Sequence, residues 1–381
     1  MFISNMPDKY LHIVSFDIPY PPNYGGVIDV FYKIKALHKK GIKIILHCYE
    51  YNGRDRNDEL KKYCEKVFYY PRILGLISAL SLKPYIVSSR RSEKLINNLL
   101  KDDYPILFEG LHSCYYINDK RLKNRFKIYR ESNIEHLYYF NLFRADKKTF
   151  NKLYFLFASI KLRLYQKVLK HASLMLVVSQ KDTEYLGKHF PENKVEYLPS
   201  FHANEKVESK TGNGDYALYN GNIEVPENAH AVSYLINGVF NDLNIPLVVA
   251  GMKPPQYIQK LSSEHLNVKI IANPDDEQMF DLIRNAHVNI LVTSQATGLK
   301  LKLLNTLYKG RYCLVNDKML NGTNLNNLCE IGNTPAELKE KLKTLFKRNF
   351  EEDQISLREK TLNKYYSNET NAEKLIQGVF G

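Results

Sequence analysis

The segment 297–310 (TGLKLKLLNTLYKG) carries the residues best suited to binding a phosphate group. If it forms a helix, Gly298, Lys302 and Asn305 share one stripe, because they lie at positions i, i+4 and i+7. A glycine in the first turn lets an anion approach the free N–H groups there, and a lysine one turn later adds positive charge. Asn305 would then be placed to hydrogen-bond a ribose. The same stripe is equally compatible with the polar surface of an ordinary amphipathic helix.

The second half of the chain alternates strand and helix patterns around this segment. Asn228 is predicted to cap a helix that runs to about residue 240. A further helix is predicted at residues 275–285. Short apolar runs predict strands at residues 216–220, 247–250, 268–271, 288–291 and 312–315.

The first half alternates in the same way, with strands predicted at residues 10–16, 42–48, 106–108, 127–130 and 174–178. Such alternation predicts an α/β protein with two Rossmann-like doubly wound domains facing across a cleft. We place the domains at residues 1–203 and 215–364, joined by a polar linker at 204–214. A C-terminal helix, about 365–381, is expected to pack back on the first domain.

Composition excludes several other classes of protein. The 381 residues are 44% hydrophobic and 25% charged, which allows a sizeable core. The five cysteines form no CxxC pair, which argues against a disulfide framework or a zinc knuckle. Residues 1–10 do not form a signal peptide, and the longest apolar run, 73–82, is about half the length of a membrane-spanning helix. We therefore expect a cytoplasmic protein.

Six segments of the chain, in this order and spacing, resemble the retaining nucleotide-sugar glycosyltransferases of the GT-B fold, the group called glycosyl transferases group 1. In that group the C-terminal domain binds a nucleotide diphosphate sugar and the N-terminal domain binds the acceptor. The matching segments are 15–44, Arg130–Tyr139 (RESNIEHLYY), Leu174–Asp182, Val195–Phe201, Tyr219–Leu235 and Ala296–Asp317.

This resemblance implies roles for individual residues in donor binding. Gly298 and Lys302 would contact the diphosphate, and Asn305 would occupy the ribose position. The other donor-binding residues implied are Asn273 beside the base, Gly221 and Asn222 near the phosphates, and Gly25 and Gly26 from the first domain.

The chain departs from the group's pattern at three positions. Thr297 and Asn305 stand where the group usually has two glutamates, and Asn222 stands where many members have Arg or Lys. Lys302 would therefore carry more of the diphosphate charge than usual.

For catalysis the resemblance points to His112, which follows the strand 106–108 and would orient or deprotonate the acceptor. Glu135 is the second candidate, and Glu109 and His136 are alternatives. A purely structural role for His112, or a Glu135 paired with Arg130, fits the sequence as well. No DxD pair is present, so no metal ion is expected to be required. The nucleotide sugar acts as co-substrate and no further cofactor is implied.

Positive charge is concentrated in the first half, where residues 1–200 hold 34 Lys and Arg against 20 Asp and Glu. Within it, 147–171 mixes aromatic, leucine and lysine residues in a pattern that can lie on an anionic membrane. The group's acceptors are often lipid-linked glycans, which makes peripheral attachment at the inner face of the plasma membrane plausible. The alternative is that the apolar face packs into the domain core and only the outer face is basic.

Two other classes of function stay open at this stage. A catalytically silent glycosyltransferase-like binding partner is compatible with Thr297 and Asn305. A basic nucleic-acid-binding protein fits the charge, but the chain has no RNP-like aromatic motif and no helix-turn-helix signature, so nucleic acid is not an expected partner.

Overall fold

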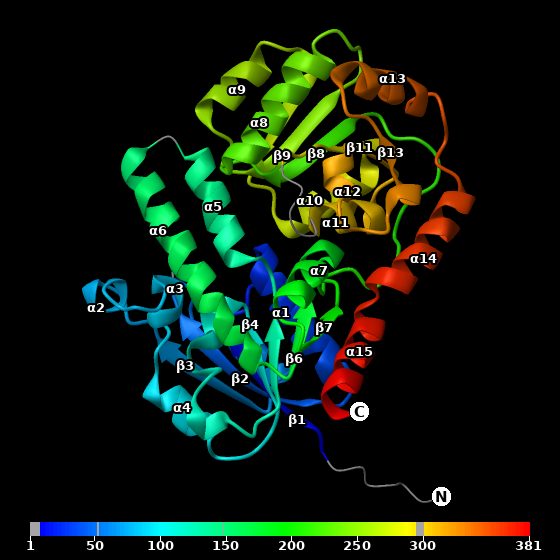
Figure 1. Ribbon diagram of the computed structural model, residues 1–381. Helices are drawn as coiled ribbons and strands as arrows, with labels where there is room; N and C mark the ends of the chain where they lie inside the picture. The colour runs from blue at the N-terminus through cyan, green and yellow to red at the C-terminus, as the bar shows by residue number, and fades with distance from the viewer. Residues whose placement is uncertain (1–7, 52, 147, 295–300) are drawn as a thin grey trace, which may run out of the picture. The chain divides into compact units, whose positions relative to one another are not determined.

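The computed structural model describes residues 8–51, 53–146, 148–294 and 301–381, which form two compact units. Unit 1 comprises residues up to Ala203 together with Asn368–Gly381, and unit 2 comprises Asn204–Ser367. Each unit is an α/β domain built on one parallel sheet (Figure 1).

The described part of unit 1 contains a seven-stranded parallel sheet in the order β3-β2-β1-β4-β5-β6-β7. Its strands are β1 (Tyr10–Ser15), β2 (Lys43–Glu50), β3 (Lys66–Pro71), β4 (Ile106–Glu109), β5 (Lys127–Arg130), β6 (Leu174–Val177) and β7 (Lys194–Tyr197). Its helices are α1 (Gly25–Lys39), η1 (Asp58–Lys62), α2 (Leu76–Ala79), α3 (Tyr85–Ser88), α4 (Glu93–Leu99), η2 (Leu111–Tyr116), η3 (Lys120–Leu122), α5 (Glu135–Ala145), α6 (Thr149–Tyr165), η4 (Gln166–His171), α7 (Gln180–His189) and α15 (Asn368–Phe380).

The described part of unit 2 contains a six-stranded parallel sheet in the order β10-β9-β8-β11-β12-β13. Its strands are β8 (Ala217–Asn222), β9 (Leu247–Met252), β10 (Val268–Ala272), β11 (Val288–Leu291), β12 (Tyr312–Val315) and β13 (Glu330–Ile331). Its helices are α8 (Pro226–Leu235), η5 (Ile236–Phe240), α9 (Gln256–Ser263), α10 (Asp276–Asn285), α11 (Leu301–Lys309), α12 (Asp317–Leu320), η6 (Asn326–Leu328), α13 (Pro335–Leu345) and α14 (Glu352–Tyr366).

Buried strands explain why both sheets are parallel. The central strand β1 runs from Leu11 to Ser15 without an exposed position, and β11 and β12 are buried along their whole length. Strands covered on both faces read as nearly continuous apolar runs, and β12 (YCLV) is an example. The apolar core of each unit therefore lies between the sheet and the helices on its two faces.

Residues 204–214, expected as a polar linker, run along unit 2. Glu208 pairs with Lys309, and Ser209 accepts a hydrogen bond from the guanidinium of Arg358. Gly212 forms a bridge with Phe350. The backbone groups of a polar segment need partners when they lie against a folded domain. Here the N–H of Glu208 donates to the backbone oxygen of Tyr308, near the end of α11, and Gly212 exchanges two backbone hydrogen bonds with Phe350, just before α14.

In each sheet, the strand order reverses between two neighbouring strands. From one of them the chain continues toward one edge of the sheet, and from the other it continues toward the opposite edge. In unit 1 these are β1 and β4, with His12 opposite Ile106, and in unit 2 they are β8 and β11, with Asn289 opposite Leu218. Ligands of open parallel sheets bind beyond the carboxyl ends of such strands. Within the described residues, no helix is both long enough and apolar enough to cross a bilayer.

Candidate functional site

In unit 2, the ammonium group of Lys302 lies beside the edge where β8 ends. Its Nζ donates to Oδ1 of Asn228 at 3.1 Å and to the hydroxyl of Tyr219 at 3.4 Å. It also lies 4.9 Å from the centre of the Tyr219 ring. Lys302 is half-buried on α11, whose Leu303, Leu304 and Leu307 are fully buried and fix the rotation of the helix. The ammonium is thus held at the carboxyl edge of the sheet.

Asn228 was predicted as a helix cap, and that prediction is wrong. Helix α8 begins two residues earlier, at Pro226, because proline is well suited to the first helical position. Asn228 instead lies inside the first turn, where its Nδ2 donates to the backbone oxygen of Asn222 at 2.7 Å. It therefore connects the end of β8 to Lys302, a role that the sequence pattern did not indicate.

Two further predicted donor residues have partners within the chain. Oδ1 of Asn305 accepts a hydrogen bond from Nδ2 of Asn204 at 2.9 Å. Asn273 follows β10 with a positive φ of 53°, a conformation that asparagine tolerates, and its Oδ1 accepts from the backbone N–H of Lys253 at 2.8 Å. Gly221 and Asn222 close β8 on the same edge. Gly298 and Thr297 lie outside the described residues.

The ends of β11 and β12 are joined by a polar contact beside this edge. The backbone N–H and C=O of Thr293 both bond to the side-chain amide of Asn316, and the Thr293 hydroxyl donates to the carboxylate of Glu227. Glu227 lies in the first turn of α8, where a carboxylate interacts favourably with the helix dipole. Glu227 and Thr293 were not predicted as site residues. Glu227 lies in the first turn of α8, and Thr293 follows the end of β11.

In unit 1, the corresponding edge places His112 next to Phe16. The two ring centres are 5.6 Å apart. The chain turns after β4 at Gly110, whose φ of 68° favours glycine, and a Cβ there would lie 3.1 Å from Nδ1 of His112. A Cβ on Gly26 would lie 2.7 Å from the Phe16 ring, so the start of α1 also needs a small residue here. Gly25, the first residue of α1, is exposed.

The structure brings the two predicted catalytic residues together. Nδ1 of His112 lies 3.7 Å from Oε1 of Glu135 and has no hydrogen-bond partner among the described residues. Burial, reinforced by the positive charges of Arg90 and Arg72, lowers the pKa of His112 to about 3. Burial raises the pKa of Glu135 to about 8, although Arg90 acts in the opposite direction. At neutral pH both side chains are therefore uncharged, and either can donate or accept a hydrogen bond.

A second buried carboxyl group, Glu131, lies at the end of β5. Its Oε2 accepts from the backbone N–H of Val178 at 3.3 Å, while its Oε1 has no hydrogen-bond partner among the described residues. Burial raises the pKa of Glu131 to about 8, and the nearby Asp182 raises it further. Nothing in the sequence distinguished this glutamate from a surface residue.

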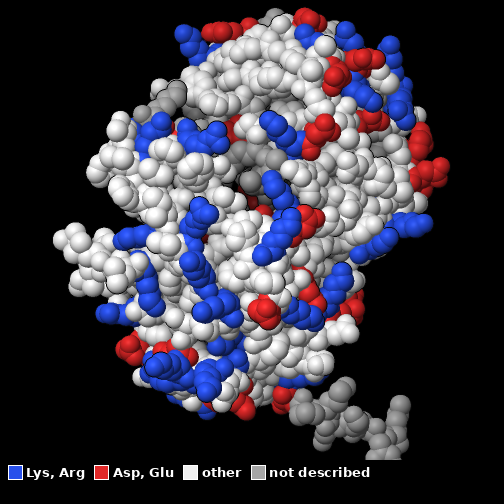
Figure 2. Space-filling view, in the orientation of Figure 1, with Lys and Arg blue, Asp and Glu red and all other residues white. Residues whose placement is uncertain are grey.

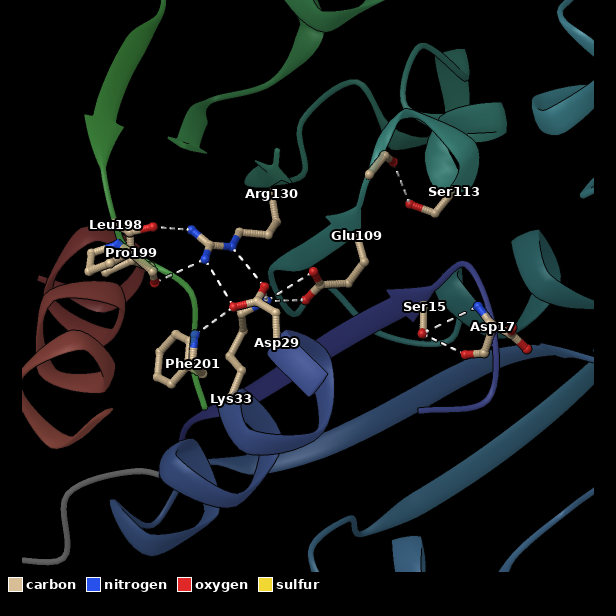
Figure 3. Close-up of polar contacts among 11 residues, drawn as sticks. Ser15, Asp17, Asp29, Lys33, Glu109, Ser113, Arg130, Leu198, Pro199 and Phe201 are labelled. Atoms are coloured by element: carbon tan, nitrogen blue, oxygen red, sulfur yellow. Dashed lines mark hydrogen bonds and ion pairs between the residues drawn. The ribbon is translucent and has the colours of Figure 1, made fainter. Parts of the chain in front are cut away.

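A buried network of charges lies under the same edge (Figure 3). Asp29 on α1 receives two hydrogen bonds from Arg130, at 3.0 and 3.1 Å, and Lys33 bridges Asp29 and Glu109. Burial acts to raise the pKa of Asp29, but Arg130 and Lys33 outweigh it and hold that pKa below its ordinary value. Arg130 also donates to the backbone oxygens of Leu198 and Pro199. The network therefore fixes the chain that follows β7.

The remaining catalytic alternatives have other partners. Glu109 is held by Lys33 at 2.7 and 2.9 Å, within the charge network. His136 contacts Gln166 at 2.8 Å, which joins α5 to η4. Arg130 pairs with Asp29, so the pairing of Glu135 with Arg130 that the sequence allowed does not form. Of the candidates, His112 and Glu135 are the two whose side chains lie close to each other.

Comparison with known proteins agrees with this architecture. No family model matches the chain. It is 24% identical over 335 residues to an uncharacterized 44.6 kDa protein in the cps region of Klebsiella pneumoniae, an alignment that covers 83% of this chain and 84% of that protein.

Solved structures are similar along almost the whole chain. HepE of Anabaena, crystallised with UDP and glucose, superposes with a TM-score of 0.64 at 9% identity over 97% of this chain and 98% of its own. Sucrose-phosphate synthase of Thermosynechococcus elongatus gives 0.62 at 14% identity, covering 98% and 95% of the two chains. A UDP-forming α,α-trehalose-phosphate synthase of Burkholderia xenovorans gives 0.62 at 9% identity, covering 98% and 100%.

At these identities the similarity establishes the fold. The strand orders and the full-length similarity to solved glycosyltransferases show that this chain has the GT-B fold, with two Rossmann-like α/β domains.

Proposed function

We propose that this protein transfers a sugar from a UDP- or GDP-linked nucleotide sugar to a glycan or lipid-linked acceptor, with retention, in the assembly of cell-surface polysaccharide. The complexes of HepE with UDP and glucose, and with UDP-glucose, support the donor class. The relative in the cps region supports the setting. Retention rests on the sequence resemblance to the retaining group, and the anomeric configuration of the product, read by NMR, tests it.

The observation that carries the proposal is the position of Lys302. A glycosyl transfer releases a nucleotide diphosphate, on which negative charge grows as the sugar takes on oxocarbenium character. Lys302 presents its ammonium beside the carboxyl ends of the unit 2 strands, held by the amide oxygen of Asn228 and the hydroxyl of Tyr219. A diphosphate at this position would replace these neutral acceptors with anionic oxygens, which adds charge–charge attraction to the hydrogen bonds of the ammonium. The proposal needs no metal ion for this step.

In unit 1, we assign acceptor positioning to His112 and Glu135. Both groups are neutral near pH 7, and Nδ1 of His112 lacks a partner among the described residues. A sugar hydroxyl can supply the hydrogen bond that this nitrogen lacks. Glu135, protonated in the ligand-free protein, can hold the opposite side of the same hydroxyl or the imidazole itself.

Replacing Lys302 with alanine is expected to weaken the binding of UDP or GDP about ten- to hundredfold, because a hydrogen bond to a charged group contributes about 1.5–3 kcal/mol. Isothermal titration calorimetry measures the change. Lys343→Ala, an exposed lysine on α13, is the matched control and should leave the Kd unchanged. Unaltered binding in a folded Lys302→Ala protein would remove the basis of the proposal.

A catalytically silent binding partner is the second candidate function. The hydrogen bond between Asn305 and Asn204 favours it, because the group at the expected ribose position already has a partner within the chain. Turnover separates the two candidates. An enzyme hydrolyses or transfers its donor, and the rate falls in Lys302→Ala, whereas a silent partner binds the nucleotide tightly without turnover on any acceptor pool.

A further inference from the structure

Unit 1 carries a short segment between β3 and α3 whose aliphatic side chains face solvent. In this apolar tip, residues 74–82, Leu76 is 77% exposed, Ile77 74%, Leu80 81% and Leu82 97%. One of the two serines of the tip faces inward, since Ser78 is buried and its hydroxyl donates to the backbone oxygen of Ile73. The arrangement is the reverse of a normal soluble surface, where such side chains are buried.

Helix α6 also exposes large apolar side chains, although Leu162 on its inner face is buried. Its exposed apolar stripe consists of Phe150, Leu153, Phe157, Ile160 and Leu164, whose spacing of three or four residues puts them on one face. The small polar Ser159 lies on the opposite face, buried, and donates to the backbone oxygen of His136 at 2.8 Å. We expected core packing with a basic outer face, but the exposed outer face is largely apolar, and the side that carries Ser159 faces α5.

A hydrogen bond connects the tip to helix α6, which carries the stripe. Nζ of Lys161, on α6, donates to the backbone oxygen of Ser81 at 3.0 Å. Lys83, directly after the tip, lies over the rings of Tyr115 and Tyr165 at 4.0 and 5.8 Å. We call the tip and the stripe together the apolar face.

Positive charge surrounds the apolar face. Residues 148–171 contain six Lys or Arg and no Asp or Glu, and residues 72–92 contain four Lys or Arg and no Asp or Glu. Lys148, Arg163 and Lys167 are exposed, whereas Arg90 is buried. Figure 2 shows a projection at the left of unit 1, where Figure 1 places α2, that is almost entirely white, with Lys and Arg side chains beside it. Aliphatic side chains on a projection bordered by exposed cations match an anionic lipid surface.

We propose that the apolar face of unit 1 docks on an anionic lipid bilayer, with the tip inserted among the acyl chains and the surrounding lysines at the headgroups. Charge decides between this occupant and a second copy of the chain, because a symmetric dimer through this face would bring two basic borders together. The inference does not depend on the transfer reaction, and vesicle binding can be measured without any nucleotide sugar.

The test is co-sedimentation of the full-length protein with phosphatidylcholine vesicles that contain or lack phosphatidylglycerol. We expect the wild type to bind the anionic vesicles, and the variant Leu76→Ser/Ile77→Ser/Leu80→Ser to lose more than about tenfold in partitioning, because each buried CH₂ group contributes to insertion. Leu266→Ser, a fully exposed leucine in unit 2, is the matched control and should bind as the wild type does.

A second variant tests the charges separately. Lys148→Gln/Lys152→Gln/Lys167→Gln should weaken binding to anionic vesicles and flatten its salt dependence. Circular dichroism confirms that each variant is folded. The proposal is overturned if the wild type binds neither kind of vesicle, if the tip variant binds as the wild type does, or if ultracentrifugation shows a dimer that the tip variant dissociates while vesicles leave it unbound.

Discussion

Replacing Asp29 with alanine is expected to lower the free energy of unfolding of unit 1 by about 3–5 kcal/mol. The substitution leaves the guanidinium of Arg130 and the ammonium of Lys33 buried without their shared carboxylate. It also removes the acceptor for the backbone N–H of Phe201, at 2.7 Å. Urea unfolding followed by circular dichroism measures the loss.

A surface ion pair provides the control. Asp58 pairs with Lys61 at 2.6 Å, but both side chains are largely exposed, so Asp58→Ala should change stability little. The double variant Asp29→Leu/Arg130→Met removes charge from both sides and should cost less than Asp29→Ala alone. A loss in Asp29→Ala as small as that in Asp58→Ala would show that the network contributes little to folding.

Replacing Glu131 with glutamine should stabilise the protein by an amount that grows with pH. The pKa of Glu131 is raised from 4.5 to about 8, so the folded state keeps a proton that the unfolded state releases. The stabilisation from this protonated carboxyl is complete below pH 4.5 and is lost as the pH rises through 8. The wild type therefore loses about 1.4 kcal/mol per pH unit across this window, or about 5 kcal/mol in total, relative to Glu131→Gln.

Unfolding titrations at several pH values from 4.5 to 9 give this difference directly. The quantity to compare is the change of this stability difference with pH, because a poorly packed glutamine amide would lower the free energy of unfolding by the same amount at every pH. Glu65→Gln, at an exposed position in unit 1, controls for the amide replacement itself. A difference between Glu131→Gln and wild type that stays constant from pH 5 to pH 8 would show that the carboxyl is ionised when folded.

Most central strands were predictable from the sequence because they are buried on both faces. The strands predicted at 127–130, 288–291 and 312–315 have the observed bounds, and the one predicted at 174–178 ends one residue earlier, at Val177. Apolar runs carry this signal in β6 and β12, whereas β5 (KIYR) and β11 (VNIL) also contain buried polar residues.

Two elements, β3 and α14, were not predicted from the sequence. Strand β3, an edge strand with a half-exposed pattern, was not predicted, although its aromatic KVFYY sequence favours a strand. Helix α14 was also missed. Its capping box, in which Glu351 and Gln354 cap each other, was readable, but its burial depends on Arg358 reaching the backbone of Gly310 and Arg311, a contact between distant segments.

The part of the candidate site that lies on one helix, α11, was predictable from the sequence. The spacing on α11 put Lys302 and Asn305 on one stripe, and the structure has Leu304 and Tyr308 buried on another face of the helix. The partners Asn228 and Tyr219 come from another helix and strand, so only the fold brings them to Lys302. The proximity of His112 to Glu135 likewise depends on how β4 and β5 are registered, with Glu109 opposite Arg130.

The chain passes between the two units twice, after residue 203 and after residue 367. Within unit 1, hydrogen bonds join the segments next to these two passages. The backbone N–H of His202 donates to the side-chain oxygen of Asn368 at 3.2 Å, and Nδ2 of Asn368 donates to the backbone oxygen of His202 at 2.7 Å. Upstream, the charge network fixes Leu198 to Phe201. One side chain, that of Asn368, therefore joins the segment just before the first passage to the segment just after the second.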